Sequence, residues 1–358
     1  MIGKHASGGS RVFPIVGVVG ALLVVATVVI VARSEPDRAT TADRATTPAV
    51  ASQSIVESTP ASPGTSTEPS PQPKKERLVI HAAGDTNLDP NYVDTFRSEG
   101  YGYAWTGLDG LFQNDDLTIV NLECAVSNKG SAVPKEFNFR GDPAALPAMR
   151  KAGVEIASLA NNHSYDFGPQ ALVDTVKNIR KAGITPIGAG SDDEEAEAPA
   201  YLDIKGWKIA VVPWDFVVDP YPTAVAAPGH PGTAFGHDFN GVLKTVKAAS
   251  RNADLVIVQT HWGVELETRP NLAQVPLGHR LIDAGADIIF GGHSHRIQPL
   301  EIYKGKPIFW SLGNFVWPLF SIEGAQSGVA EVTVGPDGAI KARLLPATIT
   351  APGHPELR

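Results

Sequence analysis

The sequence contains little sulfur and has no excess of basic charge. Cys124 is the only cysteine in 358 residues, so no disulfide can form within the chain. We expect its side chain to be a small buried group rather than a catalytic thiol, because no neighbour would activate it. Acidic residues outnumber basic ones by 38 to 30. Since nonspecific nucleic-acid binding needs a basic surface, this composition argues against a nucleic-acid partner.

Aromatic residues are missing from a long stretch near the N-terminus. Residues 33–76 contain no Phe, Trp or Tyr but hold 14 Ser or Thr and 7 Pro in 44 positions. A segment of this composition cannot bury enough apolar surface to offset the entropy lost on ordering. We expect a disordered linker that acts as a spacer.

Charge is missing from residues 12–32, which form an apolar run of 21 positions. As a helix this run would be roughly 30 Å long, enough to cross a bilayer core. Lys4 and Arg11 precede it without an acidic residue, which favours a cytoplasmic N-terminus at residues 1–11. The run exceeds the ~7 to 15 apolar residues of a cleaved signal peptide. We expect an uncleaved transmembrane anchor with the following domain outside the cytoplasm; cleavage would instead release a secreted protein.

Residues 77–358 are expected to form one α/β domain. Three segments with helical periodicity end at an Ala-Gly pair, and an apolar run follows each. The glycines are Gly153, Gly183 and Gly285. Glycine adopts the left-handed conformation after a helix without a Cβ penalty. The predicted helices span residues 143–152, 169–182, 241–251 and 272–284. This alternation indicates mostly parallel, buried strands.

The sequence pattern changes from alternating helices and strands to hairpins towards the C-terminus. From Pro299 onward the runs EIYKGKPIFWSLG and VAEVTVGPDGAIKARLLPATI predict hairpins, so we expect a second sheet layer.

The acidic run at residues 192–197 is expected to be a solvated loop, because adjacent like charges repel and calcium-loop spacing is absent.

Polar side chains follow five separate apolar runs. The carboxyl ends of parallel strands meet at one edge of a sheet, so these side chains should share a site. The runs LVIHAAG, LTIVNL, VEIASLA, DLVIVQT and DIIFGG are followed by Asp85, by Glu123, by Asn162 and His163, by His261, and by His293 and His295.

The local motif with the clearest chemistry is GGHSH, which places His293 and His295 two residues apart after glycines that permit a tight turn. A single histidine is more often structural than a ligand, but here oxygen donors follow the neighbouring strands. A mixed oxygen and nitrogen set suits manganese, iron or zinc. The donors are too many for one ion, whereas two ions roughly 3.5–4 Å apart could share a bridging carboxylate.

His163 directly follows a candidate ligand. It could protonate a leaving group or bind a developing oxyanion. Asp166, three residues further on, could orient the imidazole; as an alternative it could cap the helix that begins near Pro169.

Several motifs in order resemble one family. They are GD at 84–85, NLE at 121–123, ANNHSYDFG at 160–168, HWG at 261–263, GGHSH at 291–295 and SLGNF at 311–315. Together they resemble the CapA capsule-synthesis proteins of the calcineurin-like metallophosphoesterase superfamily, which are associated with poly-γ-glutamate. The resemblance covers roughly residues 78–315 and implies a four-layer αββα sandwich with a dinuclear site between two sheets.

The resemblance also implies roles for individual residues. Glu123 would bridge two metal ions, and His163 would be the catalytic histidine. The first ion would be held by Asp85 and His295, and the second by Asn162, His261 and His293.

The motifs differ from the wider superfamily at two positions. Asn87 stands where a DxH motif would place a ligand histidine, so the first ion should bind more weakly through Asn87. Glu123 replaces the usual bridging aspartate. Both differences look typical of the CapA branch.

Three further residues are candidates for the substrate cleft: Arg140, Trp262 and Asn314. A guanidinium can hold a carboxylate or phosphate with two parallel hydrogen bonds. As alternatives, Arg140 could form a surface ion pair, Trp262 could pack in the core, and Asn314 could cap a turn.

These observations predict a membrane-anchored, extracytoplasmic protein of capsule or poly-γ-glutamate biosynthesis with hydrolase or transferase chemistry on an amide or phosphoester. Its partners would be the anionic polymer and membrane-bound synthesis machinery. A non-catalytic assembly or export factor is the first alternative. A general extracellular phosphatase or nucleotidase is the second, disfavoured by Asn87.

Overall fold

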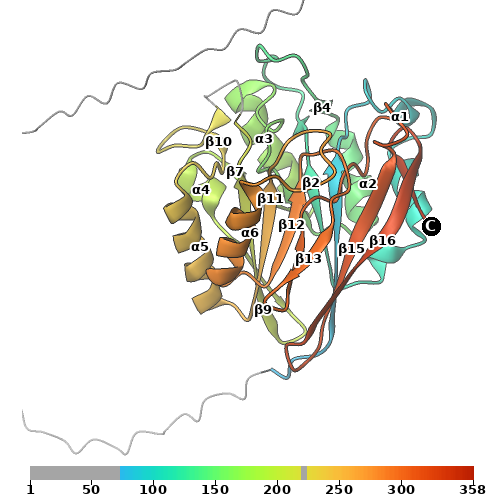
Figure 1. Ribbon diagram of the computed structural model, residues 1–358. Coiled ribbons are helices and arrows are strands. Elements are labelled where there is room, and N and C mark those ends of the chain that lie inside the picture. The colour runs from blue at the N-terminus through green and yellow to red at the C-terminus, as the bar shows by residue number, and fades with distance from the viewer. Residues whose placement is uncertain (1–72, 219–223) are drawn as a thin grey trace, which may run out of the picture. The chain divides into compact units, whose positions relative to one another are not determined.

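The computed structural model describes residues 73–218 and 224–358 (Figure 1). The expected membrane segment and nearly all of the expected linker lie outside these residues. Within the described ranges, no helix has the length and apolar character needed to cross a membrane. The last linker residues pack on the domain: Lys75 Nζ lies 2.7 Å from Asp254 Oδ1, and Glu76 N donates to the Lys205 carbonyl at 3.0 Å.

Two mixed β-sheets form the centre of the fold. The first has the strand order β17-β16-β15-β1-β2-β5-β6 and the second the order β13-β14-β12-β11-β9-β8. Strands β1, β2, β5 and β6 are parallel to one another, as are β9, β11, β12 and β14. The α/β class predicted from the sequence is confirmed.

The first sheet consists of β1 (Leu78–Thr86), β2 (Leu117–Leu122), β5 (Ile156–Ser158), β6 (Thr185–Ile187), β15 (Gln326–Val334), β16 (Ile340–Ala351) and β17 (His354–Leu357). The second consists of β8 (Ala200–Ile204), β9 (Trp207–Asp215), β11 (Leu255–His261), β12 (Ile288–Gly292), β13 (Leu300–Tyr303) and β14 (Lys306–Phe309). Two short pairs are β3 (Ala125–Val126) with β4 (Arg140–Gly141) and β7 (Ala189–Gly190) with β10 (Gly232–Thr233).

The α-helices are α1 (Thr95–Ser98), α2 (Leu146–Lys151), α3 (Gly168–Lys181), α4 (Asp193–Glu197), α5 (Phe239–Asn252) and α6 (Gln274–Asp283). Three 3-10 turns are η1 (Tyr103–Leu108), η2 (Leu111–Gln113) and η3 (Pro143–Ala145). All four helices predicted from periodicity are present, the first as η3 followed by α2. Gly153, Gly183 and Gly285 follow their helices with φ of 108°, 77° and 114°, as their left-handed role requires.

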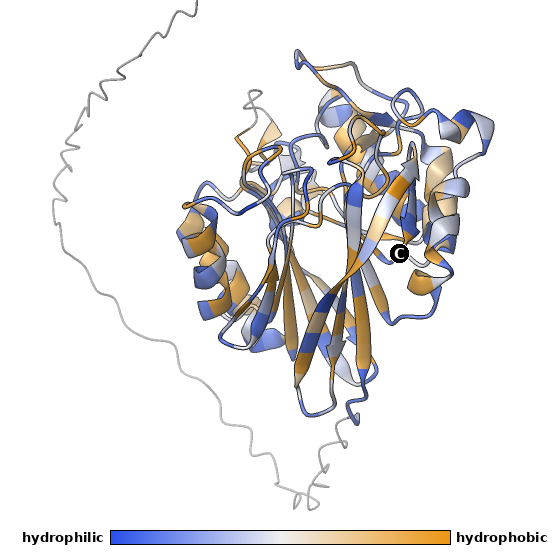
Figure 2. Cartoon of the chain, turned by 45° about the vertical axis from the view of Figure 1, so that its right-hand side comes forward, coloured by the Kyte–Doolittle hydropathy of each residue, from blue (hydrophilic) through white to orange (hydrophobic). Residues whose placement is uncertain are grey.

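The two sheets lie face to face, with helices on the outer side of each (Figure 2). Side chains in a strand alternate between faces, so neighbouring residues enter different cores. In β2, Ile119 packs between the sheets while Val120 packs under the helices of the first sheet. In β11, Ile257 packs between the sheets while Val258 packs under α5 and α6. Three buried cores therefore separate successive layers of helices, sheet, sheet and helices.

The late hairpins are present, but they do not form a layer of their own. Strands β13 and β14 extend the second sheet, whereas β15, β16 and β17 extend the first by antiparallel pairing. The first sheet thus has antiparallel strands at one edge of its parallel part, and the second sheet has one at each edge.

One loop prediction was wrong. The acidic run forms the short helix α4, and the Asp192 side chain accepts from Glu195 N at 2.9 Å at its start. Three acidic residues in the first turn lie at the positive end of the helix dipole, which offsets their mutual repulsion.

Truncation in the core between the sheets should destabilise the protein far more than the same change at its surface. Ile257→Ala removes a fully buried side chain and is expected to lower the free energy of unfolding by about 2–5 kcal/mol. Ile302→Ala, at a side chain that is 57% exposed in strand β13, should cost less than about 0.5 kcal/mol. Urea unfolding of both variants measures this, and equal losses would contradict the layer assignment.

Candidate metal centre

Asp85, Glu123 and His295 converge where the two sheets meet. Asp85 is the penultimate residue of β1, Glu123 directly follows β2, and His295 lies in the loop after β12. One ligand atom from each lies within 4.8 Å of the other two, so the cluster could hold a metal ion. The parallel pairing of β1 with β2 brings the two carboxylates to the same edge.

The two carboxylates are buried and incompletely satisfied. Neither Asp85 nor Glu123 is exposed to solvent, and Glu123 Oε1 has no hydrogen-bond partner. Burial, followed by the charge of Asp85 and a hydrogen bond to it, raises the pKa of Glu123 well above its usual range. Leaving an ionised oxygen unpaired away from water is costly. A bound cation would remove that cost, so this donor set fits a metal.

Two further imidazoles border the cluster. His261 Nε2 lies 2.9 Å from Asn162 Oδ1 and 3.6 Å from Glu123 Oε1, while His293 Nδ1 is buried without a partner. Burial, then the neighbouring His293, lowers the pKa of His261 well below its usual value. Burial, then His295, lowers the pKa of His293 to about 4. Both rings are therefore held neutral, which is the form that binds metal.

His295 behaves differently. Burial alone would lower its pKa, but a hydrogen bond to Asp85 and the charge of that carboxylate outweigh it, so the pKa is raised. His295 Nδ1 lies 3.1 Å from Asp85 Oδ2 and 2.9 Å from Asn314 Oδ1. Asn314 Nδ2 in turn donates to the Gly324 carbonyl at 3.0 Å. Asn314 thus orients His295 and borders the adjacent cavity.

The backbone around these histidines is unusual. His293 and His295 have φ of 88° and 53°, a region that residues with a Cβ seldom adopt and that recurs at functional sites. A Cβ built on Gly292 would lie 2.6 Å from Asp85 Oδ1, so only glycine lets this strand end pass the carboxylate. The glycines of GGHSH therefore serve close approach at the end of β12, whereas the left-handed backbone lies at the two histidines.

His163 and Asp166 form a separate buried pair beside the cluster. His163 Nδ1 lies 2.8 Å from Asp166 Oδ2, and Asp166 Oδ1 lies 2.8 Å from Lys135 Nζ. Asp166 also accepts from Phe139 N at 2.7 Å. The structure thus pairs Asp166 with the imidazole; the N-cap position of α3 belongs to Phe167, which makes no side-chain cap.

Three sequence candidates occupy other roles. Asn87 Oδ1 accepts from Asp89 N at 2.8 Å, so this oxygen is engaged within its own turn. Arg140 donates to the carbonyls of Ser127, Lys129 and Gly130, and its guanidinium lies 3.7 Å from the centre of the Phe167 ring. Its donors hold a loop and are not directed to a ligand.

Trp262 packs in the core between the second sheet and α6. Its indole N–H donates to the Trp310 carbonyl at 2.8 Å, and the two indole rings stack 5.4 Å apart. It is 1% exposed and does not line a cleft. The core-packing alternative is the arrangement that the structure shows.

Two asparagines were missed by the sequence analysis. Asn121 Nδ2 donates to Asp85 Oδ1 at 2.8 Å and to Glu123 Oε2 at 3.3 Å, and lies 3.1 Å from His261 Nδ1. Asn161 Nδ2 donates to Asn121 Oδ1 at 3.1 Å. The signal for Asn121 was its position two residues before Glu123, since alternate residues of a strand face the same side.

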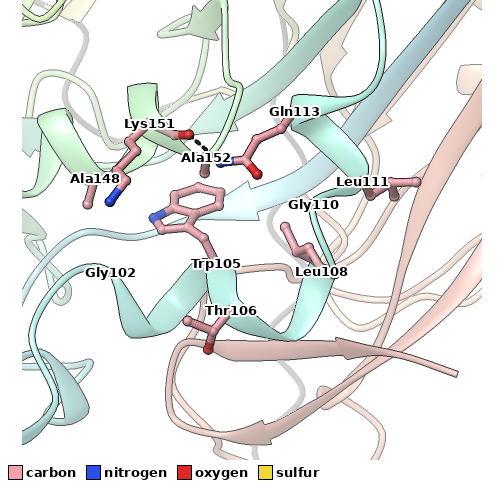
Figure 3. A pocket seen from close by; sticks show the side chains of 10 residues that line it. All are labelled: Gly102, Trp105, Thr106, Leu108, Gly110, Leu111, Gln113, Ala148, Lys151 and Ala152. Atoms are coloured by element: carbon pink, nitrogen blue, oxygen red, sulfur yellow. Dashed lines mark hydrogen bonds between the residues drawn. The ribbon is translucent and has the colours of Figure 1, made fainter.

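A cavity of about 350 Å³ opens beside the cluster and is bordered by His163, His295, Asn314, Phe139 and Trp317. A second cavity, of about 410 Å³, lies around Trp105 between η1 and α2 (Figure 3). Lys151 is its only charged lining residue, and Gln113 Nε2 there donates to the Lys151 carbonyl at 2.8 Å. Of these two cavities, the first is the one that borders the candidate metal cluster.

Comparison with known proteins agrees with the motif order. Residues 79–318 match the family described as bacterial capsule synthesis protein PGA_cap. The chain is 30% identical over 252 residues to the capsule biosynthesis protein CapA of Bacillus anthracis, covering 68% of this chain and 61% of that protein. It is 28% identical over 243 residues to the PGA biosynthesis protein CapA of Bacillus subtilis, covering 67% and 63%.

A protein of Mycobacterium tuberculosis named a probable polyglutamine synthesis accessory protein is 33% identical over 252 residues, covering 68% of this chain and 63% of that protein. The chain thus spans less than two thirds of the length of these relatives. The family match includes every residue of the cluster and its flanking motifs. The resemblance to capsule-synthesis proteins is confirmed, and the chain belongs to the bacterial capsule synthesis protein PGA_cap family.

Proposed function

We propose that this protein acts on an anionic capsule polymer such as poly-γ-glutamate, as a metal-dependent hydrolase or transferase of the calcineurin-like metallophosphoesterase type. The observation that carries the proposal is the buried cluster of Asp85, Glu123 and His295 beside an open cavity. The names of the relatives from the two Bacillus species support the polymer.

Two divalent ions, of manganese, iron or zinc, would fit the donors. Asp85 and His295 would hold one, His261, His293 and Asn162 the other, and Glu123 would bridge them. The unpartnered Glu123 Oε1 and His293 Nδ1 support this division. When bound, such ions supply Lewis-acid activation of the scissile group and of the attacking water.

The protein side chains then direct the proton. Because Asp166 holds His163 Nδ1, the other ring nitrogen, Nε2, is left to face the cavity that His163 borders. A protonated Nε2 would donate to the leaving atom, and the Asp166 carboxylate would stabilise the imidazolium. Lys135 fixes Asp166 from the other side and thereby limits the orientations of the ring.

Residues 12–32 are proposed to anchor the protein with the domain outside the cytoplasm, or to leave a secreted protein if they are cleaved. The chain joins β1 at Leu78, whereas Asp85 lies near the far end of this nine-residue strand, roughly 23 Å away. The proposed catalytic edge therefore points away from the position where the linker reaches the domain, which leaves it open to polymer and to membrane-bound synthesis machinery.

A non-catalytic role in polymer assembly or export is the second candidate. The Mycobacterium tuberculosis relative is named as an accessory protein, which favours a supporting function. A general phosphatase or nucleotidase ranks below both, because Asn87 replaces a ligand histidine and its side-chain oxygen is engaged locally.

Metal binding should depend on the cluster. His295→Ala is expected to lower the bound Mn²⁺ by at least one ion per chain, because it removes a nitrogen ligand and the partner of Asp85. His279→Ala is the matched control, since that ring pairs with Glu301 away from the cluster. Elemental analysis of the purified proteins measures both; unchanged stoichiometry in His295→Ala would refute the assignment.

Glu123→Gln should have opposite effects with and without metal. In the presence of a chelator, the substitution removes a buried carboxyl group whose pKa is raised. The free energy of unfolding should therefore exceed that of the wild type by about 1–3 kcal/mol at neutral pH. This gain should shrink as the pH falls towards about 4.3, where the unfolded glutamate is also protonated. With excess Mn²⁺ the wild type should become the more stable protein. Thermal unfolding of both proteins in chelator and in excess Mn²⁺ measures these stabilities. If Glu123→Gln remained more stable than wild type in excess Mn²⁺, Glu123 would not bridge the ions.

His163→Ala should retain metal but lose turnover by about 10²- to 10⁴-fold, because it removes a proton donor and no ligand. The assay uses γ-glutamyl polymer and phosphomonoesters, with exposed His237→Ala as control. Polymer yield in cells separates the two candidate functions. If His163→Ala leaves the yield intact while deletion of residues 1–32 abolishes it, the assembly role replaces the enzymatic one.

A further inference from the structure

The cavity beside the candidate metal centre is bordered by a basic side chain that the sequence analysis did not identify. Arg296 directly follows His295 and borders this cavity together with His163 and Asn314. A ligand held there would lie next to both the metal cluster and the proposed proton donor. Groups that line this cavity are therefore placed to select what reaches the centre.

The guanidinium of Arg296 is only partly used by the protein. Its Nη1 donates to the His295 carbonyl at 2.8 Å. Among residues 73–218 and 224–358, no carboxylate lies within ion-pair distance of it, whereas Arg150 and Arg343 pair with glutamates at 2.9 and 2.7 Å. Arg296 is half-buried, so an unpaired charge at this position is more costly than on an open surface. The remaining N–H donors are suited to an anionic group.

The wall against which Arg296 lies is well defined. A Cβ built on Gly324 would approach Arg296 Nη1 to 3.3 Å, so the guanidinium rests close to this backbone. Gly324 N donates to Ser321 Oγ at 2.9 Å, and its carbonyl accepts from Asn314. The same asparagine that orients His295 thus also holds the loop that supports Arg296.

The other walls are apolar. Phe137 and Phe320 are 50% and 71% exposed at the cavity, and Trp317 lies deeper. Rings in this arrangement bury methylene groups favourably. A bare phosphate has no apolar part to use them, whereas a chain of carboxylates separated by methylenes and amides does. Glu265 also borders the cavity, so a polyanion needs a compensating cation there.

We propose that Arg296 is a specificity-determining residue that pairs with a carboxylate of the substrate chain while its methylenes pack on Phe137, Trp317 and Phe320. This rests on the proposed function, because it names the residue by which that cavity would recognise an anionic polymer. It also supplies the local basic group that an acidic domain needs to hold such a ligand.

The test measures binding of two synthetic probes to the full-length chain: a short γ-linked glutamate oligomer and the corresponding γ-linked glutamine oligomer, which lacks the carboxylates. Arg296→Gln is expected to weaken the glutamate oligomer by roughly 10- to 100-fold, the effect of losing a charge-assisted hydrogen bond. The substitution should not change the already weak binding of the glutamine oligomer. Loss of the guanidinium in the protein and loss of the carboxylates in the probe remove the same interaction. Arg280→Gln, on the outer helix α6, is the matched control and should bind both probes as wild type does.

Two results would overturn the proposal. They are an unchanged affinity of Arg296→Gln for the glutamate oligomer and an equal affinity of wild type for the two oligomers. Urea unfolding and Mn²⁺ stoichiometry of Arg296→Gln, both expected to match wild type, exclude a folding or metal defect. Binding is also measured in chelator. If the wild-type protein bound no Mn²⁺, the proposed function would be refuted. The change in oligomer affinity caused by Arg296→Gln would still test the role of Arg296.

Discussion

The contact between two buried carboxylates, Asp85 and Glu123, is the constraint on which the rest of the site depends. Neither is exposed, and burial followed by the charge of Asp85 raises the pKa of Glu123. Asn121 donates to both, and His295 lies against Asp85, yet Glu123 Oε1 stays unpaired. An arrangement of this kind is unfavourable for folding alone and favourable for holding a cation. His261 and His293, whose pKa values are lowered by burial, add candidate metal donors, whereas His295 pairs with Asp85.

The fold supports this contact by delivering strand ends from two sheets to one place. Strands β1 and β2 belong to the first sheet, and β11 and β12 to the second. Loops after β11, β12 and β14 form much of the wall of the adjacent cavity. One hydrogen-bonded unit around Asn314 positions both His295 and the loop at Gly324. The candidate metal cluster and the adjacent cavity therefore share one hydrogen-bonded support, whereas residues 73–77 lead into β1 at its opposite end.

Much of the candidate site could be predicted because its potential metal ligands follow apolar runs. Asp85, Glu123, His261, His293 and His295 were all found by that rule, and the structure brings them together. The rule failed for side chains whose role depends on what surrounds them. Arg140 and Trp262 looked suited to a cleft, but their donors are taken by backbone carbonyls of a loop and of a neighbouring strand end. Asn121 and Arg296 were overlooked because their neighbours lie far away in the sequence.

The sequence by itself determined the α/β class, the four main helices, the strand ends that carry ligands and the family, because periodicity, glycine positions and motif order are local properties of the chain. Only the tertiary structure decided that Asp166 pairs with His163, that Asn314 holds His295, and that Arg296 borders the cavity with no ion-pair partner among the described residues, whereas Arg140 holds a loop. Whether a polar group is free or satisfied depends on contacts between residues distant in sequence. That question is settled only when the two sheets have packed and every neighbouring donor and acceptor is in place.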